Sequence, residues 1–122
     1  MFKDMYRKNL GKTGESLACE YLKCNKIKVL DKNYKNKIGE IDIIAKDGDT
    51  VAFVEVKTRS SYIFGTPAEA VNYKKQQKII KTALKWMTDK NYEDDIRFDV
   101  IEVLINETGA PDINYIKNAF GG

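Results

Sequence analysis

Three charged residues near the middle of the chain have the types and spacing of a metal-dependent phosphodiesterase site. Asp42 stands in an apolar run at 39–45, and Glu55 and Lys57 stand two apart in a second apolar run at 51–57. Two carboxylates can hold a Mg²⁺ ion, which prefers oxygen ligands and completes its octahedron with water and substrate phosphate. Such an ion polarises the phosphate and activates water, while a lysine stabilises the developing charge or orients that water.

A simpler interpretation fits the same three residues. Charged residues on a strand usually form a solvated face, and Lys57 opposite Glu40 would then be an ordinary cross-strand ion pair. Two carboxylates that face each other repel by about 0.2–1 kcal/mol when exposed, so Asp42 opposite Glu55 calls for an offsetting cation. The spacing alone leaves both interpretations open.

The two apolar runs are predicted to form a β-hairpin. Both are rich in β-branched residues, and the polar segment 46–50 between them contains Asp47-Gly48, a strong turn signal. A turn centred there pairs residues whose numbers sum to about 97, so Asp42 lies nearly opposite Glu55. Because strand side chains alternate between faces, the other face is expected to be wholly apolar core. Its members are Ile41, Ile43, Val54 and Val56.

The remaining elements follow from hydrophobic periodicity. Helices are expected at 9–25 and 73–89, and further strands at 27–34, 96–105 and 113–116. Gly11 and Gly14 are unusual inside a helix and indicate either a late start near Thr13 or a close backbone approach. The element order α-β-β-β-α-β-β predicts an α/β fold with a mixed β-sheet flanked by helices.

The size and composition of the chain restrict the classes of function that it can have. The chain has 122 residues, of which 43% are hydrophobic, so residues 1–122 are expected to form a single domain with loosely ordered ends at 1–8 and 118–122. The net charge of +3 permits a phosphate-backbone partner. The sequence contains no histidine, which excludes histidine bases, Ser-His-Asp triads and histidine zinc sites.

The cellular setting is inferred from the cysteines and the N-terminus. Cys19 and Cys24 lie five apart in the first predicted helix, a poor spacing for a disulfide, which favours reduced thiols. The N-terminus lacks the apolar segment of a signal peptide, and no run approaches the ~18 apolar residues of a membrane span. We therefore expect a cytoplasmic protein with no membrane partner.

Two motifs resemble a known nuclease superfamily. The run Gly39-Glu40-Ile41-Asp42, followed after the hairpin by Glu55-Val56-Lys57-Thr58-Arg59, resembles the PD-(D/E)XK motif of archaeal Holliday-junction resolvases. The stretch 11–98 as a whole is similar to the YraN-like family of small bacterial proteins. This second similarity adds Gly14-Glu15, the run from Phe64 to Val71 and the run from Lys74 to Lys78.

The resemblance implies a restriction-endonuclease-like core and assigns roles by position. Asp42 and Glu55 would be metal ligands, Lys57 the catalytic lysine, and Glu15 an additional ligand from the first helix. Gly-Glu-Ile replaces the proline that often precedes the aspartate, a common departure in the superfamily. Without the resemblance, Glu15 has an equally good interpretation as an acid favoured by the positive end of the helix dipole.

Basic residues near the motif are candidates for contact with nucleic acid. Lys74 and Lys78 begin a basic stripe on the 73–89 helix, with Gln76 between them, although a solvated helix face has the same pattern. Arg59 follows the motif strand, and its planar fork suits phosphate oxygens. The stripe continues along the helix with Lys81 and Lys85, which fit the solvated interpretation better.

These observations lead to one main hypothesis and two alternatives. The chain is expected to be a Mg²⁺-dependent endonuclease acting on DNA, with Mn²⁺ as an alternative metal. It would recognise structure more than sequence, because no residues remain for a base-reading domain. A resolvase-like role would further require a symmetric homodimer. The alternatives are a non-catalytic nucleic-acid-binding or protein-interaction module that retains the nuclease fold, and a binding module for an acidic small ligand.

Overall fold

The computed structural model describes residues 2–59, 71–105 and 110–121, with side chains in the first helix described from Thr13 onward. Most of the motif run from Phe64 to Val71 and the turn expected at 106–109 therefore lie outside the described residues. The elements are α1 (Phe2–Cys24), β1 (Lys28–Lys35), β2 (Glu40–Asp47), β3 (Thr50–Arg59), α3 (Tyr73–Asp89), β4 (Asp95–Leu104) and β5 (Asp112–Phe120).

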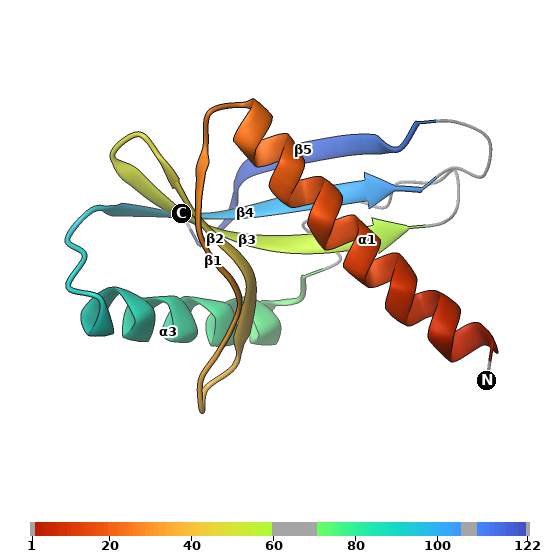
Figure 1. The fold of residues 1–122 in the computed structure, drawn as a ribbon. Coiled ribbons are helices and arrows are strands. Elements are labelled where there is room, and N and C mark those ends of the chain that lie inside the picture. Colours follow the sequence, from red (N-terminus) through yellow and green to blue (C-terminus); the bar gives the residue numbers. More distant parts are fainter. Residues whose placement is uncertain (1, 60–70, 106–109, 122) are drawn as a thin grey trace.

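The five strands form one mixed sheet in the order β1-β2-β3-β4-β5. β3 and β4 are parallel and the other neighbouring pairs are antiparallel, so α3 lies in the crossover between two adjacent parallel strands. Helices α1 and α3 lie on different sides of the sheet (Figure 1). The predicted α/β class, with a mixed sheet flanked by helices as in a restriction-endonuclease-like core, is confirmed.

Each face of the sheet has its own hydrophobic core. On the α3 side, strand residues such as Phe53 and Phe98 pack against Ile79 and Trp86 of the helix. On the α1 side, Ala18, Cys19 and Leu22 pack against Ile43, Ala45, Ala52, Val54, Ile101 and Val103. Because each strand contributes alternate residues to two cores, both helices fix the position of β3 at the centre of the sheet.

The hairpin register follows the sequence prediction closely. Ile43 pairs with Val54 and Asp47 with Thr50, so paired residues sum to 97, and Gly48 provides the positive φ of 61° that the tight turn requires. Helix α3 spans the predicted residues. Strand β5 continues to Phe120, farther than expected, because this phenylalanine is buried and stacks on Phe98.

Helix α1 begins at Phe2, so the late start near Thr13 is wrong and Gly14 lies within the helix. Gly14 is buried against β3, and a Cβ at this position would overlap the Thr58 hydroxyl. The close backbone approach is therefore the reason for this glycine. Among the described residues, neither helix is long and apolar enough to cross a membrane.

Candidate metal centre

Asp42 lies where β2 separates from β3. The ladder between these strands runs from the Asp47–Thr50 pair to the Ile43–Val54 pair, and Asp42 is the next residue along β2. Its Oδ2 accepts a hydrogen bond of 2.8 Å from the backbone N–H of Val56. The carboxylate thus replaces a backbone carbonyl as the partner of this donor, which fixes its orientation on the sheet.

One expectation about this strand is wrong. Ile41 was expected to share the α1-side face with Ile43 and Val54, but it belongs to the α3-side core together with Ile44. Residues three apart lie on opposite faces of a regular strand, so the pleat of β2 is broken between Ile41 and Ile44. Asp42 stands at this irregularity, which is why its carboxylate points across to β3.

Glu55 lies on the α3 side of β3, two residues beyond the buried Phe53. It is only 8% exposed, and its Oε1 lies 3.0 Å from the Nζ of Lys75 at the start of α3. The cross-strand ion pair considered for Lys57 and Glu40 is absent from the described ion pairs, and Glu40 is exposed beside Lys35 of β1. The charge of Glu55 is instead balanced by a helix residue.

Lys75 was not among the predicted site residues, although the sequence contains its signal. Lys75 precedes Ile79, Thr82 and Trp86 by four, seven and eleven positions, and these three belong to the buried stripe of α3. Its side chain therefore starts on the core-facing side of the helix. Asn72 caps the helix by accepting from the backbone N–H of Lys75 at 2.9 Å, which fixes the first turn beside the sheet.

The charges around Asp42 shift the pKa values of the group. Burial, followed by the negative charge of Glu55, raises the pKa of Asp42 from 3.8 to about 7, with Glu15 adding a smaller effect. Burial lowers the pKa of Lys57, and the adjacent Lys75 lowers it further. Burial opposes the charged form of Lys75 too, but its hydrogen bond and attraction to Glu55 outweigh this and raise its pKa.

Glu15 lies on α1 next to Gly14 and is partly buried. Its charge reaches Asp42, but within the described residues no three Asp, Glu, His or Cys side chains lie close enough together to hold a metal. Of the two acids that act on Asp42, Glu55 has the larger effect and Glu15 the smaller one. The set of three carboxylate ligands, Asp42, Glu55 and Glu15, stays a prediction.

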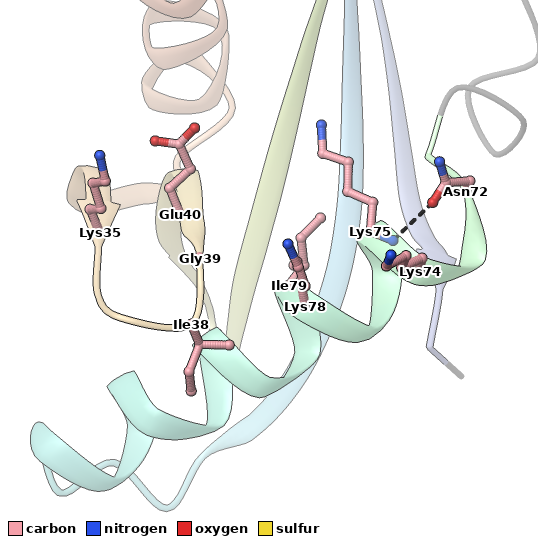
Figure 2. A pocket seen from close by; sticks show the side chains of 9 residues that line it. All are labelled: Lys35, Ile38, Gly39, Glu40, Asn72, Lys74, Lys75, Lys78 and Ile79. Carbon is pink, nitrogen blue, oxygen red and sulfur yellow. Dashed lines mark hydrogen bonds between the residues drawn. The ribbon is translucent and has the colours of Figure 1, made fainter.

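The predicted nucleic-acid contacts divide into three groups. Lys74 and Lys78 are exposed and line a pocket of about 610 Å³ between the β1–β2 turn and α3, together with Lys35, Ile38, Gly39, Glu40, Asn72, Lys75 and Ile79 (Figure 2). Gln76 faces elsewhere, because its Nε2 donates to the carbonyl of Val71 at 2.7 Å. Arg59 ends β3, and its backbone carbonyl accepts from Ile105.

A second residue that the sequence analysis missed is Glu102 of β4. It is fully buried, pairs with Lys57 in the β3–β4 register and has no hydrogen-bond partner for either carboxylate oxygen among the described residues. Burial raises its pKa, and the charge of Arg59 opposes that rise. The sequence signal was an acid within the apolar run of β4, at 100–104.

The chemistry of the donor set fits one divalent cation. Asp42 and Glu55 offer anionic oxygens, and their mutual repulsion is the kind that a bound cation removes. The ammonium of Lys75 at Glu55 shows that the position attracts positive charge. Mg²⁺ commonly takes only one or two protein carboxylates and completes its shell with water and phosphate, so a third acid is not required.

Comparisons with known proteins cover nearly the whole chain. Residues 14–103 match the family described as uncharacterised protein family UPF0102. A UPF0102 protein of Alkaliphilus oremlandii (strain OhILAs) is 52% identical over 116 residues, which cover 93% of this chain and 98% of that protein. UPF0102 proteins of Clostridium botulinum strains 657 and Kyoto are 47% and 48% identical, over 93% of this chain and 94% of theirs.

Proposed function

This chain belongs to the UPF0102 family, as its resemblance to YraN-like proteins predicted, and we propose that it is a metal-dependent endonuclease that hydrolyses DNA phosphodiester bonds. The observation that carries the proposal is the carboxylate pair Asp42 and Glu55, which interacts with Lys57 and with Lys75, a residue that also lines the basic pocket. Carboxylates held close together at an energetic cost, with shifted pKa values, are typical of functional sites.

In this proposal each residue has a distinct task. Asp42 and Glu55 bind a Mg²⁺ or Mn²⁺ ion, and the Val56 N–H keeps Asp42 in the orientation that binding needs. When bound, such an ion polarises the phosphate and lowers the pKa of coordinated water. Lys57 stabilises the charge that develops on the phosphate or holds the attacking water.

DNA is the substrate that suits the surroundings of the pair. Lys35, Lys74 and Lys78 lie around the adjacent pocket, and three phosphate contacts would give binding a salt dependence with a slope of about −3. The described part of the chain adds no separate base-reading element to the sheet and its two helices. We therefore propose selectivity for DNA structure. A symmetric homodimer would be needed if the substrate were a four-way junction.

One observation favours the non-catalytic alternative. Lys75 already neutralises Glu55, and no three-ligand group is assembled in the described residues. A protein that only binds nucleic acid could use the same ion pair as a permanent structural contact. The two functions differ in whether a divalent cation binds at Asp42 and Glu55.

The test is a cleavage assay on duplex, single-stranded, flap and four-way-junction DNA with Mg²⁺, Mn²⁺ or EDTA. We expect cleavage of at least one branched substrate with metal and none in EDTA. Asp42→Asn should abolish cleavage, whereas Asp49→Asn, the same change in the exposed turn of the hairpin, should retain it. Salt-dependent DNA binding without cleavage of any substrate would support the non-catalytic module instead.

A further inference from the structure

Lys75 places a positive charge where the proposed metal would bind. Its Nζ lies 3.0 Å from Glu55 Oε1, and its charge also acts on Asp42. In Figure 2 its side chain extends from the start of α3 toward the strands, while Lys74 stays beside the helix. The same lysine lines the basic pocket. Lys75 thus stands at the boundary between the carboxylate pair and the pocket.

We propose that Lys75 is an exchangeable counter-ion, which neutralises Glu55 when no metal is bound and moves to the phosphate of DNA in the pocket when a divalent cation takes its place. This inference rests on the proposed function, because it requires metal binding at Asp42 and Glu55. It assigns to Lys75 a role in coupling metal binding to substrate binding.

Geometry and charge favour the exchange. A divalent ion bound at about 2.1 Å from Glu55 would occupy the space in front of the carboxylate and repel the ammonium. The Lys75 side chain is 43% exposed, so it can turn without repacking the core, whereas the Glu55 side chain is only 10% exposed and stays in place. A lysine ammonium on four flexible methylenes suits such a movement.

The destination of the lysine is set by its surroundings. Lys74, Lys78 and Lys35 line the pocket with it, and Glu40 is the acid among the lining residues. A DNA phosphate in the pocket would supply the negative charge that Lys75 loses when it leaves Glu55. Metal binding would therefore add one phosphate contact to the DNA interface.

A permanent structural ion pair would behave differently. If Lys75 only stabilised the fold, its removal would lower stability and leave metal affinity unchanged or weaker, because Glu55 would lose its orientation. The exchange instead predicts that removal of the competing charge strengthens metal binding. The two roles therefore differ in the sign of the effect on metal affinity.

The first measurement is the affinity of the full chain for Mg²⁺ and Mn²⁺, by titration calorimetry, for wild type and Lys75→Met. Methionine keeps most of the length of the side chain without its charge. We expect Lys75→Met to bind the metal about three- to tenfold more tightly than wild type. This range corresponds to the loss of one partly exposed ion pair that competes with the metal for Glu55. The matched control Lys74→Met, one position away and exposed, should stay within about twofold of wild type.

The second measurement is the salt dependence of DNA binding, in EDTA and with Ca²⁺, which binds oxygen ligands as well. The quantity compared is the slope of the logarithm of DNA affinity against the logarithm of salt concentration. In EDTA this slope should be equal for wild type and Lys75→Met. With Ca²⁺ the wild-type slope should be steeper by about 1, the value for one additional phosphate contact. Lys74→Met should reduce the slope under both conditions. A role confined to folding does not produce this dependence on the metal.

The outcomes separate the inference from the proposed function. If wild type binds metal and Lys75→Met binds it equally or more weakly, the exchange is refuted while the metal site stands. If neither protein binds metal, both proposals fall. Circular dichroism establishes that the variant is folded, and Lys75→Gln repeats the test if methionine disturbs the packing.

Discussion

Asp42→Asn provides the sharpest test of the site, because its effect on stability has a sign opposite to that of most buried substitutions. The amide keeps the shape of the side chain, and its oxygen can still accept from the Val56 N–H. The negative charge beside Glu55 is lost. The substitution therefore removes the cost of burying the charge, which is the larger cause of the raised pKa, and the repulsion from Glu55, while the hydrogen bond remains.

The size of the effect follows from the pKa of Asp42. A rise from 3.8 to about 7 is about three units, which corresponds to a ceiling of about 4 kcal/mol at 1.36 kcal/mol per unit. Asp42 retains some contact with solvent, and the unfolded chain is not free of charge interactions. We therefore expect Asp42→Asn to gain about 1–2 kcal/mol of unfolding free energy at pH 8 in EDTA.

The pH dependence gives an independent check. Because the folded-state pKa is raised, the folded protein binds this proton more tightly than the unfolded chain does. The wild type keeps the associated stability below pH 4 and loses it as the pH rises from about 4 to about 7. The difference between variant and wild type should therefore be small at pH 4, grow through this window and level off above it.

Urea unfolding in EDTA across pH 4–8, and thermal melts with and without Mg²⁺, measure both effects. Mg²⁺ should raise the midpoint of the wild type and raise that of Asp42→Asn much less, since a ligand that binds only the native state stabilises it. Asp49→Asn in the exposed turn is the control. The reasoning is refuted if Asp42→Asn is less stable than wild type in EDTA at pH 8 and both proteins respond equally to Mg²⁺.

Three further substitutions test other parts of the structure. Gly14→Ala should cost about 1–3 kcal/mol in urea unfolding because its Cβ overlaps the Thr58 hydroxyl, and adding Thr58→Ala should recover part of this loss; an unchanged single variant would contradict the close approach. Glu102→Gln should be as stable as wild type at pH 4 and more stable at pH 8. Burial raises the pKa of Glu102, so the wild type loses stability as the pH rises. A variant less stable than wild type at pH 8 would point to a stabilising partner for the carboxylate. Asp99→Asn should lower the free energy of unfolding by about 3–5 kcal/mol at pH 7. The buried Asp99 carboxylate accepts from Arg97 at 2.9 Å, so the substitution leaves that guanidinium without its main anionic partner. A loss below about 1 kcal/mol would mean that Arg97 is neutralised without Asp99.

Local signals were sufficient to predict the hairpin and its register. The Asp47-Gly48 turn and the alternation around it placed Asp42 opposite Glu55. In the structure, the numbers of paired β2 and β3 residues also sum to 97. The position of Ile41 could not be obtained in this way, because the break in the β2 pleat occurs where pairing with β3 ends. Such a break depends on neighbouring strands rather than on the local pattern.

The helix-borne part of the site was harder to predict. Lys74, Lys75 and Lys78 have the same chemistry and all line the pocket, and the spacing from the buried stripe distinguishes Lys75 only as a core-facing residue. That its ammonium reaches Glu55 depends on how α3 packs on the sheet. The burial of Glu102 likewise depends on what covers the sheet. Pairs close in sequence were predictable, whereas contacts across the β3–α3–β4 crossover needed the structure.

The parallel pairing of β3 with β4 has a consequence for the order in which the chain folds. The β2–β3 hairpin closes a two-residue turn, whereas the β3–β4 pair must bring together strands that are separated in sequence by the whole crossover connection. The two carboxylates therefore meet early, and Lys75 reaches them only when the crossover docks. We therefore expect the acidic half of the site to form before its basic half. Truncation of Val54, which pairs with Ile43 in the hairpin and packs on the face away from α3, should slow refolding more than truncation of Ile79 in α3. The reverse order would contradict this sequence of events.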